Sequence, residues 1–130
     1  MPQNADTHAI LDVGGDDSGA TALAGFSSRI SAAGYQMLYV INMYRPMVAD
    51  PKDAVELMRD IEYNSRLKCT AIVNNSNLGV ETTLETVRDS FEYANEVSRL
   101  SGLPIAFTSA LDSLNCEGTF GIKNMTRKMF

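Results

Sequence analysis

The sequence of 130 residues is long enough for one domain with its own core, and its contents of 45% hydrophobic and 21% charged residues are typical of a globular protein. A net charge of -5 argues against direct nucleic-acid binding, and two distant cysteines with one histidine argue against a metal site built from soft ligands. No apolar run reaches membrane-spanning length and no signal peptide is recognisable, so we expect a cytoplasmic protein without a membrane span.

The first motif is the apolar run Ala9–Val13, which contains Asp12 and is followed by a glycine pair. A short apolar run bounded by glycine is typical of a buried strand, and we expect one here. Gly14 and Gly15 then form a turn into a helix. A strand that ends on an acid and turns through glycine into a helix is a common place for chemistry in α/β proteins.

Apolar runs and helix-period patterns then alternate along the chain. Helices are predicted at Ser18–Ala33, Asp50–Leu67 and Thr82–Ser101, and buried strands at Gln36–Asn42, Cys69–Asn74 and Ile105–Ser109. Asp50 suits the N-cap of the second helix, Thr82 and Glu85 form a capping box for the third, and Gly102 ends that helix. After these elements we expect one helical turn at Leu111–Leu114 in a C-terminal tail.

This alternation predicts an α/β fold, a mostly parallel sheet of about four strands with helices on both faces. We expect a single domain over residues 1–130, with its core at 8–110 and a tail at 111–130. In such sheets the ligand binds at the carboxyl ends of the strands. Strand polarity places Asp12, Asn42, Asn74 and Ser109 at that edge, so the sequence predicts that these four side chains lie together.

Two interpretations of the turn after Asp12 are open. Gly14–Thr21 matches the phosphate-loop pattern G-x-x-x-x-G-K-[ST], except that Ala20 stands in place of the lysine. A phosphate loop surrounds its ligand with backbone N–H groups and an ammonium, whereas this turn carries the carboxylates of Asp16 and Asp17. We therefore favour the other interpretation, a magnesium-side carboxylate at Asp12 followed by a glycine turn.

The order of four short segments resembles the MinD/ParA-type P-loop ATPases of the SIMIBI class. Asp12–Gly15 is similar to the Walker B and switch II segment of that family. Segments similar to later parts of the family follow in the family's order: Asn42–Pro46, Val73–Gly79 and Leu103–Ser109. The resemblance covers roughly residues 9–110 and implies the fold of a P-loop nucleotide triphosphatase.

The same resemblance implies a nucleotide site. Asp12 would face a magnesium ion through water, and Gly14 and Gly15 would lie near the phosphates of ATP or ADP. Asn74, or alternatively Asn75, would bind the adenine ring. Folding itself would require no cofactor.

The family's lysine-bearing Walker A loop lies some tens of residues before the strand that carries Asp12, so the resemblance implies that this sequence corresponds to the C-terminal portion of such an ATPase. We then expect at most weak binding of Mg-ATP or Mg-ADP and no hydrolysis by this chain alone. A sheet without its phosphate-loop strand either closes the gap or leaves an edge that recruits a partner chain or a second copy as a homodimer. The alternative function is a non-catalytic α/β module that binds a partner chain.

Overall fold

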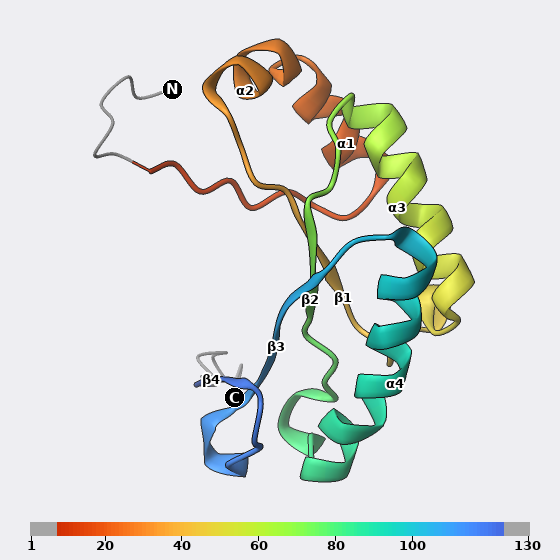
Figure 1. Cartoon of the computed structure of the whole chain (residues 1–130), viewed down its shortest axis with the longest axis vertical. Helices are drawn as coiled ribbons and strands as arrows, with labels where there is room; N and C mark the ends of the chain where they lie inside the picture. Colours follow the sequence, from red (N-terminus) through yellow and green to blue (C-terminus); the bar gives the residue numbers. More distant parts are fainter. Residues whose placement is uncertain (1–7, 124–130) are drawn as a thin grey trace, which may run out of the picture.

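The computed structural model describes residues 8–123, in which a four-stranded sheet carries helices against it (Figure 1). The strands lie in the order β1-β2-β3-β4, and every neighbouring pair is parallel. Their bounds are β1 Leu38–Ile41, β2 Ala71–Asn74, β3 Ile105–Leu111 and β4 Phe120–Ile122. The α/β class and the parallel sheet that the sequence predicts are therefore confirmed.

The helices gather on one side of this sheet. Within residues 8–123 the α-helices are α1 Asp17–Ala24, α2 Ser27–Ala33, α3 Pro51–Ser65 and α4 Leu84–Ser101, with short 3-10 helices η1 Pro46–Val48, η2 Gly79–Glu81 and η3 Asp112–Leu114. The helices α3 and α4 pack against each other on one face, α1 packs on α3, and α2 lies beyond the end where the strands begin (Figure 1). The sequence predicts helices on both faces of the sheet, and the structure has them on one face only.

Two helix boundaries follow the sequence closely. The Asp50 side chain accepts a hydrogen bond of 2.9 Å from the Lys52 N–H, and Pro51 takes the first position of α3. At the end of α4, Gly102 adopts φ 76°, and its N–H donates to the Ser98 carbonyl at 2.9 Å. A left-handed residue at this position favours glycine, which has no Cβ, and this explains why the helix ends there.

The start of α4 differs from the expectation by one residue. The N-cap is Thr83, whose side chain accepts from the Thr86 N–H at 3.2 Å, while the Thr86 hydroxyl accepts from the Thr83 N–H at 3.1 Å. The predicted capping box of Thr82 with Glu85 is therefore wrong. Thr82 instead donates its hydroxyl to the Gly79 carbonyl at 2.6 Å, which closes the turn before the helix.

The core lies between the sheet and the α3–α4 pair. Ile41 and Ile72 from the strands, Met58 from α3 and Val97 from α4 are each 2% exposed or less. Full burial of a side chain of this kind contributes about 1.5–3 kcal/mol to folding. The Tyr39 hydroxyl donates to the Ala54 carbonyl at 2.8 Å, and this bond joins β1 to the first turn of α3. The helix-facing side of β1 and β2 is thus buried in the core.

The segment 8–14, called the arm below, is not the buried strand that the sequence predicts. It has no strand partner among residues 8–123, and the exposed fractions of Ile10, Leu11 and Val13 are 94%, 60% and 39%. A strand requires a neighbour that completes its ladder of hydrogen bonds, and an apolar run cannot show whether the chain provides one. The strand assignment of Ala9–Val13 is therefore wrong for this chain by itself.

The arm leads into α1 through a tight turn. The Asp16 side chain caps the helix by accepting from the Gly19 N–H at 2.9 Å. The backbone of Gly14 passes so close to Gly19 that a Cβ at residue 19 would lie 2.3 Å from the Gly14 carbonyl oxygen. Gly19 therefore serves the packing of the turn on its own helix.

Two other elements differ from the expectation. The single helix predicted at Ser18–Ala33 is two helices, because the chain turns at Gly25 between α1 and α2. Residues 111–123, assigned to a tail, contain the fourth strand, β4, as well as η3 at the predicted helical turn. Residues 124–130 of that tail lie outside the described residues. None of the helices in the described range is long and apolar enough to cross a membrane.

Candidate functional site

The carboxyl ends of β1, β2 and β3 meet, as the sequence predicts, and carry a network of small polar side chains. Asn42 follows β1, Asn74 ends β2, Asn75 follows it, and Ser109 lies in β3. The Asn75 Oδ1 atom accepts from the Ser109 hydroxyl at 2.6 Å, and the Asn75 N–H donates to the Ile41 carbonyl at 2.9 Å. This edge is where open parallel sheets bind their ligands.

Asn74 is the centre of this network, and its side chain is fully buried. Its Nδ2 donates to the Ser90 hydroxyl at 2.9 Å and makes a longer bond of 3.5 Å with the Thr108 hydroxyl. Its Oδ1 accepts from the hydroxyl and the N–H of Ser76 at 2.7 and 3.3 Å. An amide side chain has two N–H donors and one acceptor oxygen, and here all three are used inside the protein. The Asn74 amide therefore has no group left for an adenine ring.

Asn42 and Asn77 tie together the loops that follow β1 and β2. The Asn42 Oδ1 accepts from the backbone N–H groups of Tyr44 and Asn77 at 3.0 and 3.3 Å. The Asn77 Oδ1 accepts from the Gly79 N–H at 3.0 Å. Among residues 8–123, every buried side-chain nitrogen and oxygen has a hydrogen-bond partner. The polar edge is thus a closed structural network, as expected for buried polar groups.

The structure does not bring the other predicted residues to this edge. Asp12, Gly14 and Gly15 belong to the arm and its turn, which lie near the end of the sheet where the strands begin (Figure 1). Asn74 and Asn75 lie at the opposite end, where β2 finishes. Within the described range there is no group of three or more His, Cys, Asp or Glu residues that could hold a metal ion. The structure therefore does not bring Asp12 and Asn74 together at one site.

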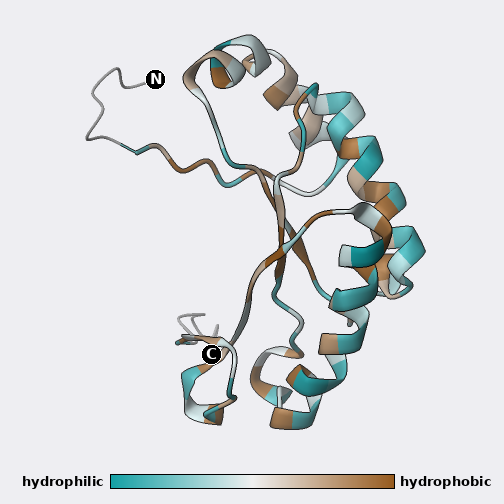
Figure 2. Ribbon diagram, viewed as in Figure 1, coloured by the Kyte–Doolittle hydropathy of each residue, from teal (hydrophilic) through white to brown (hydrophobic). Residues whose placement is uncertain are grey.

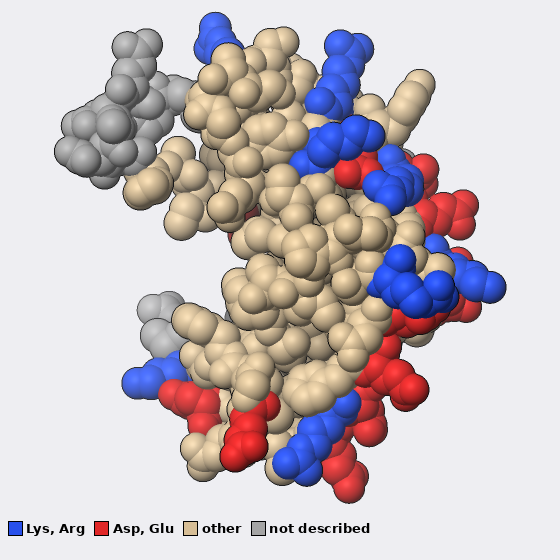
Figure 3. Space-filling model, viewed as in Figure 1, with Lys and Arg blue, Asp and Glu red and all other residues tan. Residues whose placement is uncertain are grey.

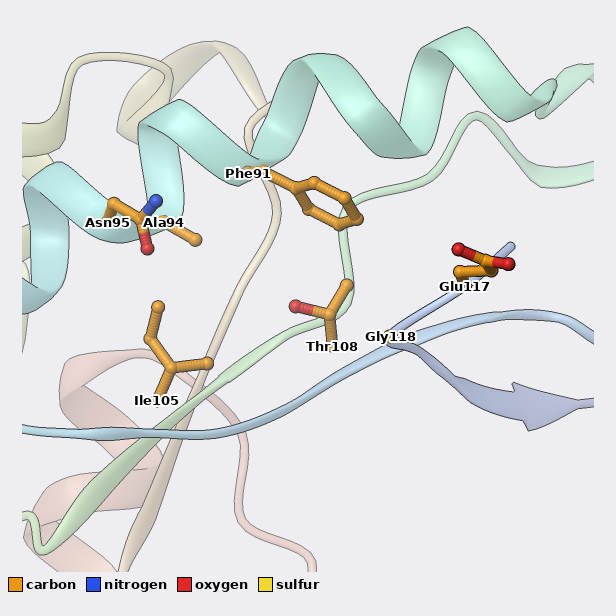
Figure 4. A pocket seen from close by; sticks show the side chains of 7 residues that line it. All are labelled: Phe91, Ala94, Asn95, Ile105, Thr108, Glu117 and Gly118. Atoms are coloured by element: carbon orange, nitrogen blue, oxygen red, sulfur yellow. The ribbon is translucent and has the colours of Figure 1, made fainter.

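A small pocket of about 280 Å³ lies between α4, β3 and the loop before β4 (Figure 4). Its lining residues are Phe91, Ala94, Asn95, Ile105, Thr108, Glu117 and Gly118. Glu117 is the one ionisable residue among them. Proton-transfer chemistry needs a positioned group of tuned pKa beside a reacting atom, and this pocket offers no second ionisable group to tune one.

The buried ionisable groups belong to the core. Burial, together with the nearby Glu62 carboxylate, raises the pKa of the Cys69 thiol to about 12. Burial also raises the pKa of Tyr93 to about 12. A thiol that stays protonated is neither a nucleophile nor a metal ligand at neutral pH. Cys69 and Tyr93 are therefore neutral at pH 7 and pack in the core.

The face of the sheet opposite the helices is the largest unexplained feature. Large apolar side chains from three of the four strands are exposed there, and we call this set the open face: Leu38 43%, Val40 57%, Phe107 40%, Phe120 61% and Ile122 37%. They share one side because Val40 pairs with Val73, Val73 pairs with Phe107, and the rings of Phe107 and Phe120 lie 5.5 Å apart. Val73 of β2, between Val40 and Phe107 on this face, is itself buried, so the exposed apolar residues lie on both sides of it. Monomeric proteins rarely leave large apolar patches in water.

The pictures show how this surface differs from the rest of the molecule. In Figure 3 most Lys, Arg, Asp and Glu side chains gather over the helices and some lie at the β4 end, while the side opposite the helices is hollowed between the arm and the β4 region. Figure 2 shows hydrophobic residues along the central strands and also along the arm. The charged helical layer faces water, and the other side is mainly apolar.

The open face adjoins an open edge. β1 is the first strand of the sheet and has no neighbour on its other side within residues 8–123. Alternate residues of β1 bond to β2, with the Ile41 carbonyl accepting from the Asn75 N–H, so the backbone N–H and C=O groups of Leu38 and Val40 point away from the sheet. An edge of this kind is a template for another strand.

Sequence reasoning missed the open face. The alternation of Leu38 and Val40 with the buried Tyr39 and Ile41 does not show whether the first pair is covered by another layer. The one signal available was that apolar residues occupy both sides of the predicted strand, as in a sheet buried on both faces.

No protein-family model, no curated protein and no solved structure matches this chain. The relation to MinD/ParA-type ATPases therefore stays a prediction from the short motifs, and the function must be argued from the geometry of the chain itself.

Proposed function

We propose that this chain is a protein-interaction module, which buries the open face of its sheet against another polypeptide. The observation that carries the proposal is the row of exposed apolar side chains from Leu38 to Ile122 on the face without helices. Parallel sheets are stable with both faces covered, because their strands are apolar on both sides. The chain supplies one helical layer, and the second layer has to come from elsewhere.

The electrostatics support the same function. The net charge is -5, but the open face is made of Leu, Val, Phe and Ile, so a partner meets apolar surface where contact is made. Depletion of charge at the centre with polar groups around it is the usual anatomy of a protein interface. A binding role also agrees with the polar edge, whose amides and hydroxyls hold the strand ends rigid.

Matched substitutions test this function through co-purification from the host cell. Val40→Asp places a carboxylate on the open face, and Val80→Asp makes the same change at a residue 76% exposed in η2. We expect one polypeptide to co-purify in stoichiometric amount with the wild type and with Val80→Asp but not with Val40→Asp. This polypeptide can be a second, differently tagged copy of the same chain. The proposal fails if all three proteins retain the same polypeptides or none.

Weak Mg-ATP or Mg-ADP binding remains a second proposal, since Asn75 lies half-buried at the edge where parallel sheets bind ligands. The arrangement of Asp12 and Asn74 does not support it. We expect a dissociation constant weaker than about 1 mM in calorimetry with Mg-ATP. Heat at lower concentrations that is lost in Asn75→Ala would establish nucleotide binding instead.

A further inference from the structure

The chain exposes two apolar surfaces that have no partner within the described residues. One is the open face with the edge of β1 beside it. The other is the arm, in which Ile10 is 94% and Leu11 60% exposed. An aliphatic run with the pattern of a strand lies in the same chain as an edge strand that lacks a neighbour. The arm can supply the neighbouring strand that the β1 edge lacks, and the β1 edge can supply the partner strand that the arm lacks.

We propose that the arm of one copy pairs as an added strand with the β1 edge of a second copy, and that the exchange is reciprocal. The inference rests on the interaction function proposed above and names the partner as a second copy of this chain. A reciprocal exchange gives a closed two-fold dimer, since the same two surfaces of each copy are used. The arm then becomes the strand that its sequence predicts.

The shape of the open face favours an arm over a flat partner. Figure 3 shows a hollow between the arm and the β4 region, and two hollow faces placed against each other would leave a void. An extended segment that pairs with the β1 edge lies about 4.8 Å from that strand. Such a segment is narrow enough to lie along the side of the hollow. In an extended segment Leu11 and Val13 point to one side, so both can lie beside Leu38 and Val40.

The β1 edge is short, with four residues, but it lacks the charged residues and prolines that block strand addition. Proteins protect edge strands with charged residues, prolines or bulges. Residues 36–42 contain no charged residue and no proline. The arm brings one charge in its strand-like part, Asp12, on the side opposite to Leu11 and Val13. When Leu11 and Val13 of the arm meet Leu38 and Val40, no charge is therefore buried and no two like charges are brought together.

The available area fits a stable dimer. From their exposed fractions, the five open-face residues with Ile10, Leu11 and Val13 present on the order of 800 Å² of accessible surface per copy, about two-thirds of it on β1 and the arm. A strand exchange at the β1 edge covers that two-thirds directly. For two copies this comes to about the 1,000 Å² in total that a specific interface needs.

Sedimentation equilibrium of the full chain tests the inference over a range of micromolar concentrations. We expect a mass of twice 14.2 kDa at high concentration and a monomer on dilution. Leu11→Asp in the arm and Val40→Asp on the open face should each raise the dimer dissociation constant about tenfold or more. Val80→Asp, on η2, should leave it unchanged. Hydrogen exchange at the Leu38 and Val40 amides should slow as the dimer forms.

Three results would overturn the inference. The first is a wild type that stays monomeric at every concentration. The second is a dimer that Leu11→Asp does not weaken, which would exclude the arm. The third is slow exchange at Leu38 and Val40 that does not depend on concentration, because the arm would then pair within its own chain. A monomeric wild type with another polypeptide lost on Val40→Asp would overturn this inference and leave the interaction function standing.

Discussion

Asn74→Ala is expected to lower the free energy of unfolding by about 3 kcal/mol, because it removes the centre of a buried network. The change deletes the bonds of Asn74 with Ser90, Thr108 and Ser76. Each buried group left without a partner costs about 1–3 kcal/mol, and the volume left by the amide adds to this. Some of the hydroxyls can turn to other acceptors, as Ser90 already does with the Val87 carbonyl, so the losses do not add fully.

Urea unfolding followed by circular dichroism measures this change, as a shift of the midpoint at an unchanged slope. Asn75→Ala is the matched control. It removes one side-chain bond, from Ser109 at 2.6 Å, at a half-buried residue, and should cost about 1 kcal/mol. A loss of unfolding free energy below about 1 kcal/mol for Asn74→Ala would refute the reasoning. The amide would then contribute little to stability and would be available to a ligand.

Two further predictions concern packing and ionisation. Gly19→Ala places a Cβ 2.3 Å from the Gly14 carbonyl oxygen and should destabilise the chain by about 1–3 kcal/mol, whereas Gly25→Ala meets only an ordinary contact of 3.6 Å and should be neutral or slightly stabilising in the same urea assay. Stability should fall as pH rises above about 9, because Cys69 and Tyr93 ionise first in the unfolded chain while burial raises both folded-state pKa values to about 12. Each group contributes at most about 1.4 kcal/mol per pH unit, and Cys69→Ala should flatten the lower part of the curve; a wild-type curve level between pH 9 and 11 would contradict this.

The elements with strong local signals could be predicted from the sequence. Asp50 and Gly102 mark the start of α3 and the end of α4, because capping depends on a few neighbouring residues. The capping box shifted from Thr82 to Thr83 because consecutive threonines offer equivalent hydroxyls, and the turn at Gly79 uses the first of them.

The elements that depend on distant partners could not be predicted. Ala9–Val13 has the composition of a strand but pairs with no strand in the described part of the chain. β4 is a strand of three residues, Phe120–Ile122, too short to show a period, and it is fixed by its ladder with β3. The sequence predicts that the polar residues at the strand ends lie at one edge of the sheet. The spacing of these residues in the sequence cannot show that the Asn74 amide is hydrogen-bonded to Ser76 and Ser90.

We propose that the open face is the place where another polypeptide binds. Photo-crosslinking with benzoylphenylalanine at residue 40, compared with the same group at residue 80, tests this most directly in the host cell. We expect adducts from position 40, with a mass of twice 14.2 kDa where the occupant is a second copy, and none of comparable yield from position 80. Equal yields from the two positions, or no adduct from position 40, would contradict the account.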